Sequence, residues 1–237
     1  MVGDLVYLAP VVPGFAAGVA LCLPWARPAR PVCLLVCLGY VLADNLVTAL
    51  GHHDNPGLHW NWAGKAFSVG LAGLVVAAVR PGRAALPLGV PVNRAGWRWS
   101  CIGIVASLLF CGGIAFIFRD HTKPGMEAIA FQATMPGLAE ELCYRGVVLV
   151  LLGRAYAQTD GTPNAIPAAV IGTLLFGLAH VIDVTAGGFR FAILPFAYAL
   201  VVGAGLAVVR IKARSVASCV LAHNVGNVCG AVMNGFG

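Results

Sequence analysis

Charged residues are scarce in this sequence, and their scarcity excludes a soluble globular fold. Asp, Glu, Lys and Arg make up 10% of the 237 residues, 59% are hydrophobic, and the mean hydropathy is +0.87. A soluble domain of ordinary composition carries about 25% charged residues. The sequence also lacks an internal repeat and any connection long enough to form a separate soluble domain. We therefore expect one membrane domain covering residues 1–237.

Acidic residues are fewer than basic ones, and the basic residues are not clustered. Nine Asp and Glu residues stand against 15 Lys and Arg residues, which gives a formal net charge of +6. The basic residues are scattered through short connections between apolar runs, a pattern that reports membrane orientation. We therefore expect the lipid bilayer as a partner and no nucleic acid.

Cysteine pairs of the metal-binding type are absent. None of the eight cysteines forms a CxxC pair, and all lie in apolar runs, so we expect small buried side chains rather than disulfides or metal ligands. The first residues also lack the positive segment of a secretory signal peptide. The first apolar run is therefore expected to remain as a helix.

Eight apolar runs approach the ~20 residues that a membrane-spanning helix requires. The prediction is an all-α, polytopic integral membrane protein with about eight transmembrane helices. Residues 1–118 would hold the N-terminal helices and residues 126–237 the remaining four. The expected helices are 5–25, 31–50, 63–79, 100–118, 126–152, 165–183, 191–209 and 216–236.

The distribution of Lys and Arg predicts the orientation. The odd-numbered connections hold ten such residues and the even-numbered connections hold three. Because positive loops remain in the cytoplasm, both termini are expected on the non-cytoplasmic side. A composition rich in Ala, Gly and Arg suggests a bacterial source, which would place the protein in the bacterial inner membrane.

Several polar residues of the first half of the chain are expected to have no catalytic or metal-binding role. Potential metal ligands occur between the second and third helices at His52, His53, Asp54 and His59. Their spacing matches no recognised site, so we expect a polar loop anchored at the interface by Trp60 and Trp62. Asp44 and Asn45 are expected to be hydrated near the outer surface, and Lys65 to reach the interface by snorkelling.

The stretch from Pro136 to Gly146, PGLAEELCYRG, places three ionisable residues inside an apolar run. Burying such groups at membrane depth costs at least ~2.5 kcal/mol each, so they are functional candidates. Glu141 and Arg145 are four residues apart and can pair on one helix face. Glu140 points about 100° away from that face and is left available for chemistry.

Two later helices carry further polar residues. His180 lies near the end of the predicted helix 165–183, while His223 and Asn227 share one face of the helix 216–236. A rise of 1.5 Å per residue places them and Glu140 ~10–22 Å from the predicted cytoplasmic side. All four side chains can therefore meet around one hydrated cavity.

These residues resemble the three motifs of the CPBP family of intramembrane proteases, which includes the type II CAAX prenyl endopeptidases and bacteriocin-processing proteins. The first motif is EExxxR at Glu140, Glu141 and Arg145, the second FxxxH from Phe176 to His180, and the third HxxxN from His223 to Asn227. The resemblance covers residues 126–237. It implies a peptidase that cleaves membrane-associated or lipid-anchored proteins or peptides.

The resemblance also implies a role for each motif position. Glu140 would be the general base and would share an activated water with His180, while His223 and Asn227 would stabilise the tetrahedral oxyanion. Glu141 and Arg145 would support the site. Phe176 and Tyr144 are expected mainly to pack, with a lesser prospect of lining a substrate groove. The mechanism that the resemblance implies requires no cofactor.

Three alternatives remain open from the residues. A zinc protease would use Glu140, His180 and His223 as metal ligands. A proton-coupled transporter would use the same acids and histidines as a relay, although transporters often show paired repeats, which this sequence lacks. The third alternative is a non-catalytic membrane scaffold.

Overall fold

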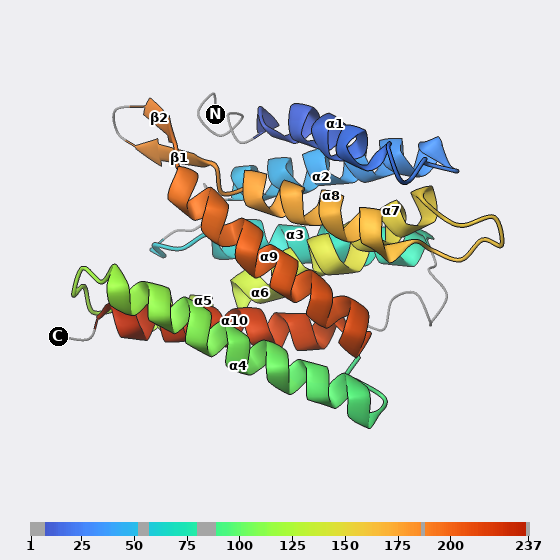
Figure 1. Ribbon diagram of the computed structural model, residues 1–237. Coiled ribbons are helices and arrows are strands. Elements are labelled where there is room, and N and C mark those ends of the chain that lie inside the picture. The colour runs from blue at the N-terminus through green and yellow to red at the C-terminus, as the bar shows by residue number, and fades with distance from the viewer. Residues whose placement is uncertain (1–7, 52–56, 80–88, 186–187, 236–237) are drawn as a thin grey trace.

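The computed structural model describes residues 8–51, 57–79, 89–185 and 188–235, and it is helical apart from one short hairpin (Figure 1). Its elements, in chain order, are α1 (Val11–Cys22), α2 (Pro31–Gly51), α3 (Trp62–Val79), α4 (Arg94–Ile117), α5 (Met126–Gln132), α6 (Met135–Glu141), the π-helical segment η2 (Leu142–Val148), α7 (Leu149–Ala155), α8 (Ala165–Leu178), β1 (Ile182–Thr185), β2 (Gly188–Phe191), α9 (Ile193–Ala213) and α10 (Val216–Asn234).

Five of the described helices are long and apolar enough to cross a membrane: α2, α3, α4, α9 and α10. Helices α1 and α8 have 12 and 14 residues, too few for a full span on their own. Large apolar side chains such as Leu35, Leu74 and Leu109 remain about 70% exposed, as lipid-facing residues would be. The protein is thus an all-α polytopic membrane protein, but the predicted count of about eight spans is not confirmed.

The predicted helix 126–152 is instead a chain of four pieces, α5, α6, η2 and α7. Pro136 occupies the first turn of α6, where its missing N–H costs nothing, so a new helix starts there. Hydrogen bonds from Thr134 to the carbonyls of Ala130 and Phe131 close the end of α5. Hydropathy alone did not predict where the helix is divided, because all four pieces are apolar.

A two-stranded antiparallel hairpin follows α8, which ends at Leu178 rather than at residue 183. Ile182 pairs with Phe191, and Asp183 with Arg190. β-Branched and aromatic residues favour strands, but four residues per strand are too few to dominate a hydropathy window. The sequence prediction of a helix to residue 183 was wrong at this point.

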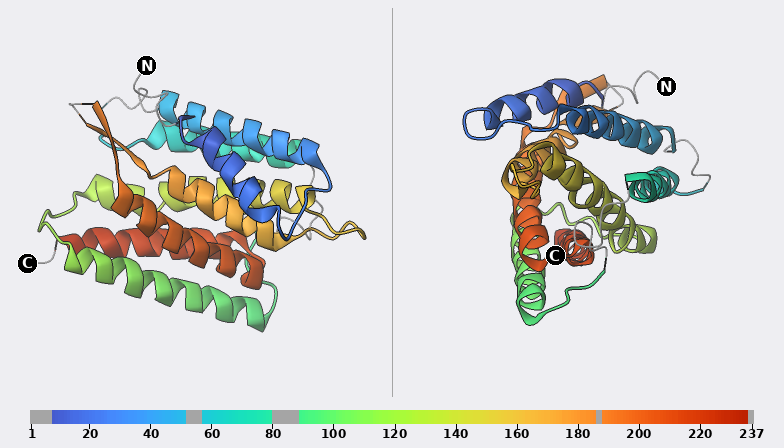
Figure 2. Two further views of the ribbon diagram at one scale, coloured as in Figure 1. Left: turned by 45° about the horizontal axis from the view of Figure 1, so that its top comes forward. Right: turned by 90° about the vertical axis from the view of Figure 1, so that its right-hand side faces the viewer.

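The two halves of the chain share one core. Buried residues of α1 and α2 join those of η2, α7 and α8 in one hydrophobic cluster, which includes Tyr40, Val148 and Ile171. Helix α3 packs against α6 and η2, so the N-terminal half touches the segment that carries the first motif. Helices α4 and α10 lie side by side with α9 crossing them, as the views of Figure 2 show.

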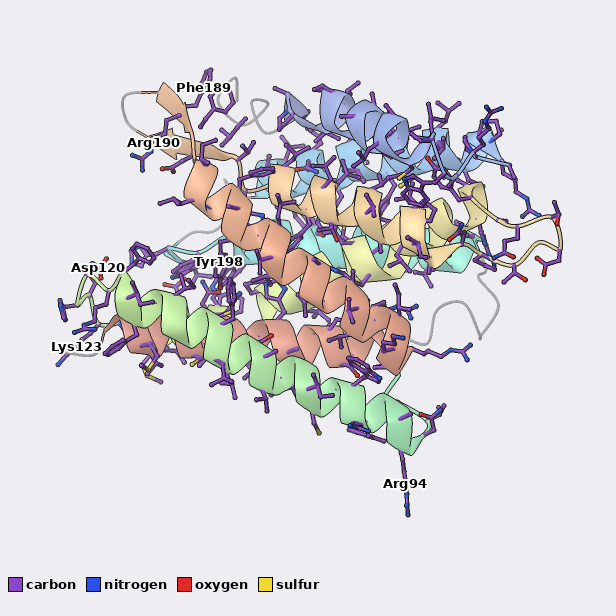
Figure 3. The ribbon with its side chains drawn as sticks, in the orientation of Figure 1. Arg94, Asp120, Lys123, Phe189, Arg190 and Tyr198 are labelled. Carbon is purple, nitrogen blue, oxygen red and sulfur yellow. The ribbon has the colours of Figure 1, made fainter. Side chains whose placement is uncertain are left out.

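The ends of the bundle differ in their charged residues. Figure 3 shows Lys123 and Arg190 at the end that carries the hairpin, and Arg94 at the opposite end. Arg27 and Arg30 follow α1, and Lys212 and Arg214 lie at the end of α9. The described residues of the odd-numbered connections, which are rich in Lys and Arg, therefore lie at one end of the bundle, and those of the even-numbered connections lie at the other end.

Candidate active site

A buried ion pair joins Glu141 to Arg145, as the four-residue spacing predicts. Nη1 of Arg145 lies 3.0 Å from Oε1 of Glu141, and the Glu141 side chain is fully buried. The second guanidinium nitrogen, Nη2, donates to the carbonyl of Gly203 on α9 at 2.9 Å. A Cβ at residue 203 would lie 2.9 Å from the ring of Phe176, so this close approach favours glycine. The pair thereby connects η2 to α9.

The same Glu141 oxygen also accepts a hydrogen bond from His223, the first residue of the third motif. Nδ1 of His223 lies 2.7 Å from Oε1 of Glu141. A carboxylate oxygen accepts, so Nδ1 of His223 is the donor and carries a proton. Glu141 therefore fixes the direction of the His223 ring as well as pairing with Arg145.

A second buried arginine supports the π-helical segment. Arg210 on α9 is 5% exposed, and its Nε donates to the backbone carbonyl of Arg145 at 3.1 Å. A π-helical turn alters the backbone ladder and often marks a functional site. The sequence prediction counted Arg210 among the positive connection residues, and that assignment was wrong.

Phe176 is the packing centre of the site. Its ring meets Tyr144 edge-on at 5.2 Å, lies 4.9 Å from the His180 ring and 6.1 Å from the His223 ring. The guanidinium of Arg145 lies 4.5 Å from its ring centroid. Tyr144 is buried by this contact, whereas Phe176 also lines the cavity described next.

One polar cavity of about 310 Å³ gathers residues from all three motifs. Glu140 lies on its wall, turned away from the Glu141 pair as helix geometry requires. Residues that share this cavity are Lys65, Glu140, Phe176, His180, His223 and Asn227. Tyr198, labelled in Figure 3, lines it from α9.

His180 lies just beyond the end of α8 and faces this cavity. Its Nδ1 is 2.8 Å from the carbonyl oxygen of Phe176, which can only accept a hydrogen bond. Nδ1 therefore carries the proton, and in the neutral ring Nε2 keeps its lone pair. The hydrogen bond of the ring goes to Phe176 rather than directly to Glu140.

His223 approaches Glu140 with its other nitrogen. Nε2 of His223 lies 3.8 Å from Oε2 of Glu140, and the His223 side chain is 7% exposed. Asn227, one turn further along α10, lines the same cavity. The structure thus places the four predicted catalytic side chains around one space, with His223 between the two glutamates.

Lys65 is a charged residue of the cavity that the sequence did not predict there. Its Nζ lies 2.7 Å from Oε1 of Glu140, and both side chains are less than one-fifth exposed. Lys65 belongs to the first turn of α3, and it points inward instead of snorkelling to the interface. The sequence offered no motif for it, because the partner lies 75 positions away.

Asp44 is also buried rather than hydrated at the outer surface. It is 7% exposed, and the hydroxyl of Ser68 donates to its Oδ1 at 2.6 Å. Burial of a carboxylate requires such a donor, and α3 supplies it. Asn45 is only partly buried and donates to the carbonyl of Val41 at 2.9 Å.

Asn224, next to His223 in the chain, has a structural role that the sequence did not predict. Its Oδ1 accepts from the backbone N–H of Gly137 at 2.8 Å, and its Nδ2 donates to the carbonyl of Thr134 at 3.1 Å. A Cβ at residue 137 would clash with that Oδ1, so glycine is needed there. Asn224 therefore ties the start of α6 to α10.

Phe131 lines the cavity, and two tryptophans pack on its ring. Trp60 stacks on Phe131 at 5.0 Å, and Trp62 meets the same ring edge-on at 5.3 Å. Glu127 accepts hydrogen bonds from the backbone N–H of Trp60 and of His59. His59 is thus held through its backbone, and the other three potential ligands of this connection lie outside the described residues.

The described part of the chain contains no group of three His, Cys, Asp or Glu side chains placed to hold a metal ion. The zinc ligands considered from the sequence were Glu140, His180 and His223. A lysine ammonium already lies against Glu140 at 2.7 Å, where it would repel a dication. The donor set therefore does not fit a zinc ion.

Residues 122–229 match the model of the family described as type II CAAX prenyl endopeptidase Rce1-like. The match covers 108 of the 237 residues, and this part of the chain is similar to that family of CAAX intramembrane endopeptidases. The match supports a peptidase, and proteases of this family act on membrane-associated protein substrates. Searches of curated proteins and of solved structures returned no match. The matched region contains all three motifs but not Lys65 or Asp44.

Proposed function

We propose that this CAAX-type peptidase is a glutamate-dependent intramembrane endopeptidase that hydrolyses peptide bonds with Glu140 as general base. The observation that carries the proposal is the shared cavity, which brings Glu140, His180, His223 and Asn227 within one polar space. Glu141 is unsuited to act as the base, because its side chain is fully buried, its Oε1 accepts from Arg145 and His223, and it is not among the residues that line the cavity. The second oxygen of Glu140, Oε2, lies on the side of Nε2 of His223, at a distance of 3.8 Å.

The chemistry follows from these positions. Water lies between Glu140 and Nε2 of His180, the nitrogen that is free to accept a proton. Glu140 removes a proton as the water oxygen attacks the peptide carbonyl, which becomes a tetrahedral oxyanion. The C–N bond then breaks, and the proton held by Glu140 passes to the leaving amine.

The oxyanion requires donors that are already in place. Asn227 offers its side-chain amide, and His223 donates from Nε2 when it is protonated at both nitrogens. Glu141 orients the ring because it accepts a hydrogen bond from Nδ1 at 2.7 Å. Donors that are preorganised away from bulk water account for a large share of catalysis in acyl transfer.

The geometry also favours a substrate at the end of the bundle that carries the hairpin. Lys65 lies in the first turn of α3 and His180 just beyond α8, so both are near that end. The bias of Lys and Arg toward the opposite end favours the non-cytoplasmic side of a bacterial inner membrane for the hairpin end. The substrate is then a membrane-associated segment in the outer half of the bilayer.

The test uses purified protein in proteoliposomes with an internally quenched peptide that ends in a prenylated CAAX sequence. The expected result is cleavage at one bond, with one ¹⁸O atom entering the new carboxylate when the reaction is run in H₂¹⁸O. An unprenylated copy of the same peptide shows whether the lipid is required. Absence of cleavage of both peptides, by protein that is folded and inserted, would contradict a CAAX-type substrate.

A further inference from the structure

The N-terminal half of the chain contributes a charged group to the catalytic cavity. Lys65 lies outside the family match at residues 122–229, yet its Nζ is 2.7 Å from Oε1 of Glu140. We propose that Lys65 is a positioning residue, whose ammonium holds the carboxylate of Glu140 in the direction needed to activate water. This inference rests on the proposed function of Glu140.

The two oxygens of Glu140 have different surroundings. Oε1 receives the ammonium at 2.7 Å, a charge-assisted hydrogen bond of the short and strong kind. Oε2 lies 3.8 Å from Nε2 of His223, which leaves it available to a water molecule. Fixing one oxygen therefore sets the direction of the other, and orientation of that kind is a large part of catalysis.

Lys65 is itself held in place by α2 and α3. Asn61 accepts from the backbone N–H of Gly64 at 2.9 Å and donates to the carbonyl of Thr48 at 2.9 Å, so the start of α3 is tied to the end of α2. One turn after Lys65, Ser68 donates to Asp44. The ammonium consequently enters the cavity from a helix start that is fixed on two sides.

A merely structural ion pair would show a different response from a positioning pair. Both roles predict a loss of stability when Lys65 is removed, because a buried carboxylate is left unpaired. Only the positioning role predicts a fall in kcat with little change in KM, in protein that remains folded. Arginine at this position keeps the charge and the donors, so Lys65→Arg is expected to restore part of the activity.

The experiment compares the parent with Lys65→Met, Lys65→Arg, Glu140→Gln and the double variant Lys65→Met/Glu140→Gln in proteoliposomes. Cleavage of the quenched prenylated peptide gives kcat and KM, and thermal unfolding gives Tm. We expect Lys65→Met to lower kcat on the order of 10²-fold, the cost of a misplaced catalytic group. The double variant should lose less Tm than the two single losses added together, because it leaves no unpaired charge.

Lys123→Met is the matched control, since Lys123 lies in the exposed connection before α5 and outside the cavity. Additive changes in Tm, or a kcat for Lys65→Met within about twofold of the parent, would overturn the assignment. Should the parent cleave none of the peptide, the CAAX-type substrate fails, whereas the positioning role of Lys65 is overturned only by additive Tm changes or by a parent-like kcat of Lys65→Met on a peptide that the parent does cleave.

Discussion

Nδ1 of His223 lies 2.7 Å from Oε1 of Glu141, 82 positions away in the chain. The carboxylate that pairs with Arg145 therefore also orients a proposed oxyanion donor. The first and third motifs form one connected unit, while Glu140 remains directed toward the cavity. Adjacent glutamates thus have separate tasks because successive helical residues point about 100° apart.

We expect Glu141→Ala and Arg145→Ala each to lower stability as well as activity. Removal of one partner of a buried pair typically costs ~3–5 kcal/mol, since the other charge is left unpaired. Thermal unfolding in detergent measures the effect. The exposed pair between Asp183 and Arg190 provides the control, because Arg190→Ala at such a site should cost only ~0–1 kcal/mol. Parent-like stability of both motif variants would show that the pair does not hold the fold.

The two asparagines of α10 should respond differently to substitution. Asn227→Ala is expected to lower kcat by ~10²–10³-fold, as removal of an oxyanion donor does, with little change in Tm. Asn224→Ala should instead lower Tm, because it removes the hydrogen bonds to Gly137 and Thr134. Kinetics and unfolding curves of the two variants distinguish these roles. An Asn227→Ala variant with parent kcat would remove Asn227 from the mechanism.

Metal removal should leave the activity unchanged. The reason is that Lys65 lies against Glu140, so a zinc ion would meet a like charge there. Elemental analysis of purified protein, followed by an assay with and without a chelator, provides the measurement. Stoichiometric zinc whose removal abolishes cleavage would select the metalloprotease alternative.

The orientation is testable with single cysteines in a background that lacks the eight native ones. Arg94→Cys and Lys212→Cys report the end rich in Lys and Arg, and Lys123→Cys reports the hairpin end. We expect an impermeant thiol reagent added to intact cells to label only Lys123→Cys. Labelling of Arg94→Cys or Lys212→Cys from outside would reverse the orientation and place the cavity nearer the cytoplasm.

Local patterns in the sequence were sufficient for the core of the site. The spacing of Glu141 and Arg145 predicts their ion pair, and the 100° step predicts that Glu140 points elsewhere. Hydropathy identifies a membrane protein, since 59% hydrophobic residues cannot be buried in a small soluble domain. The two predictions about Glu140, Glu141 and Arg145 depend only on residues within one or two helical turns.

Contacts between distant segments were not predictable in the same way. Lys65 and Asp44 look like interfacial residues in the sequence, because nothing local shows which polar group a helix will face after packing. The breaks within residues 126–152 were missed for another reason. A window of hydropathy averages over Pro136 and the π-helical turn, although both change the course of the chain.

The central claim, that Glu140 is the base, is tested most directly by Glu140→Gln in proteoliposomes. Glutamine keeps the size and the hydrogen-bonding groups of the side chain but cannot accept a proton from water. We predict that cleavage of the quenched prenylated peptide is abolished while insertion and cooperative unfolding are retained. Turnover of that peptide by Glu140→Gln at the parent rate would contradict the account.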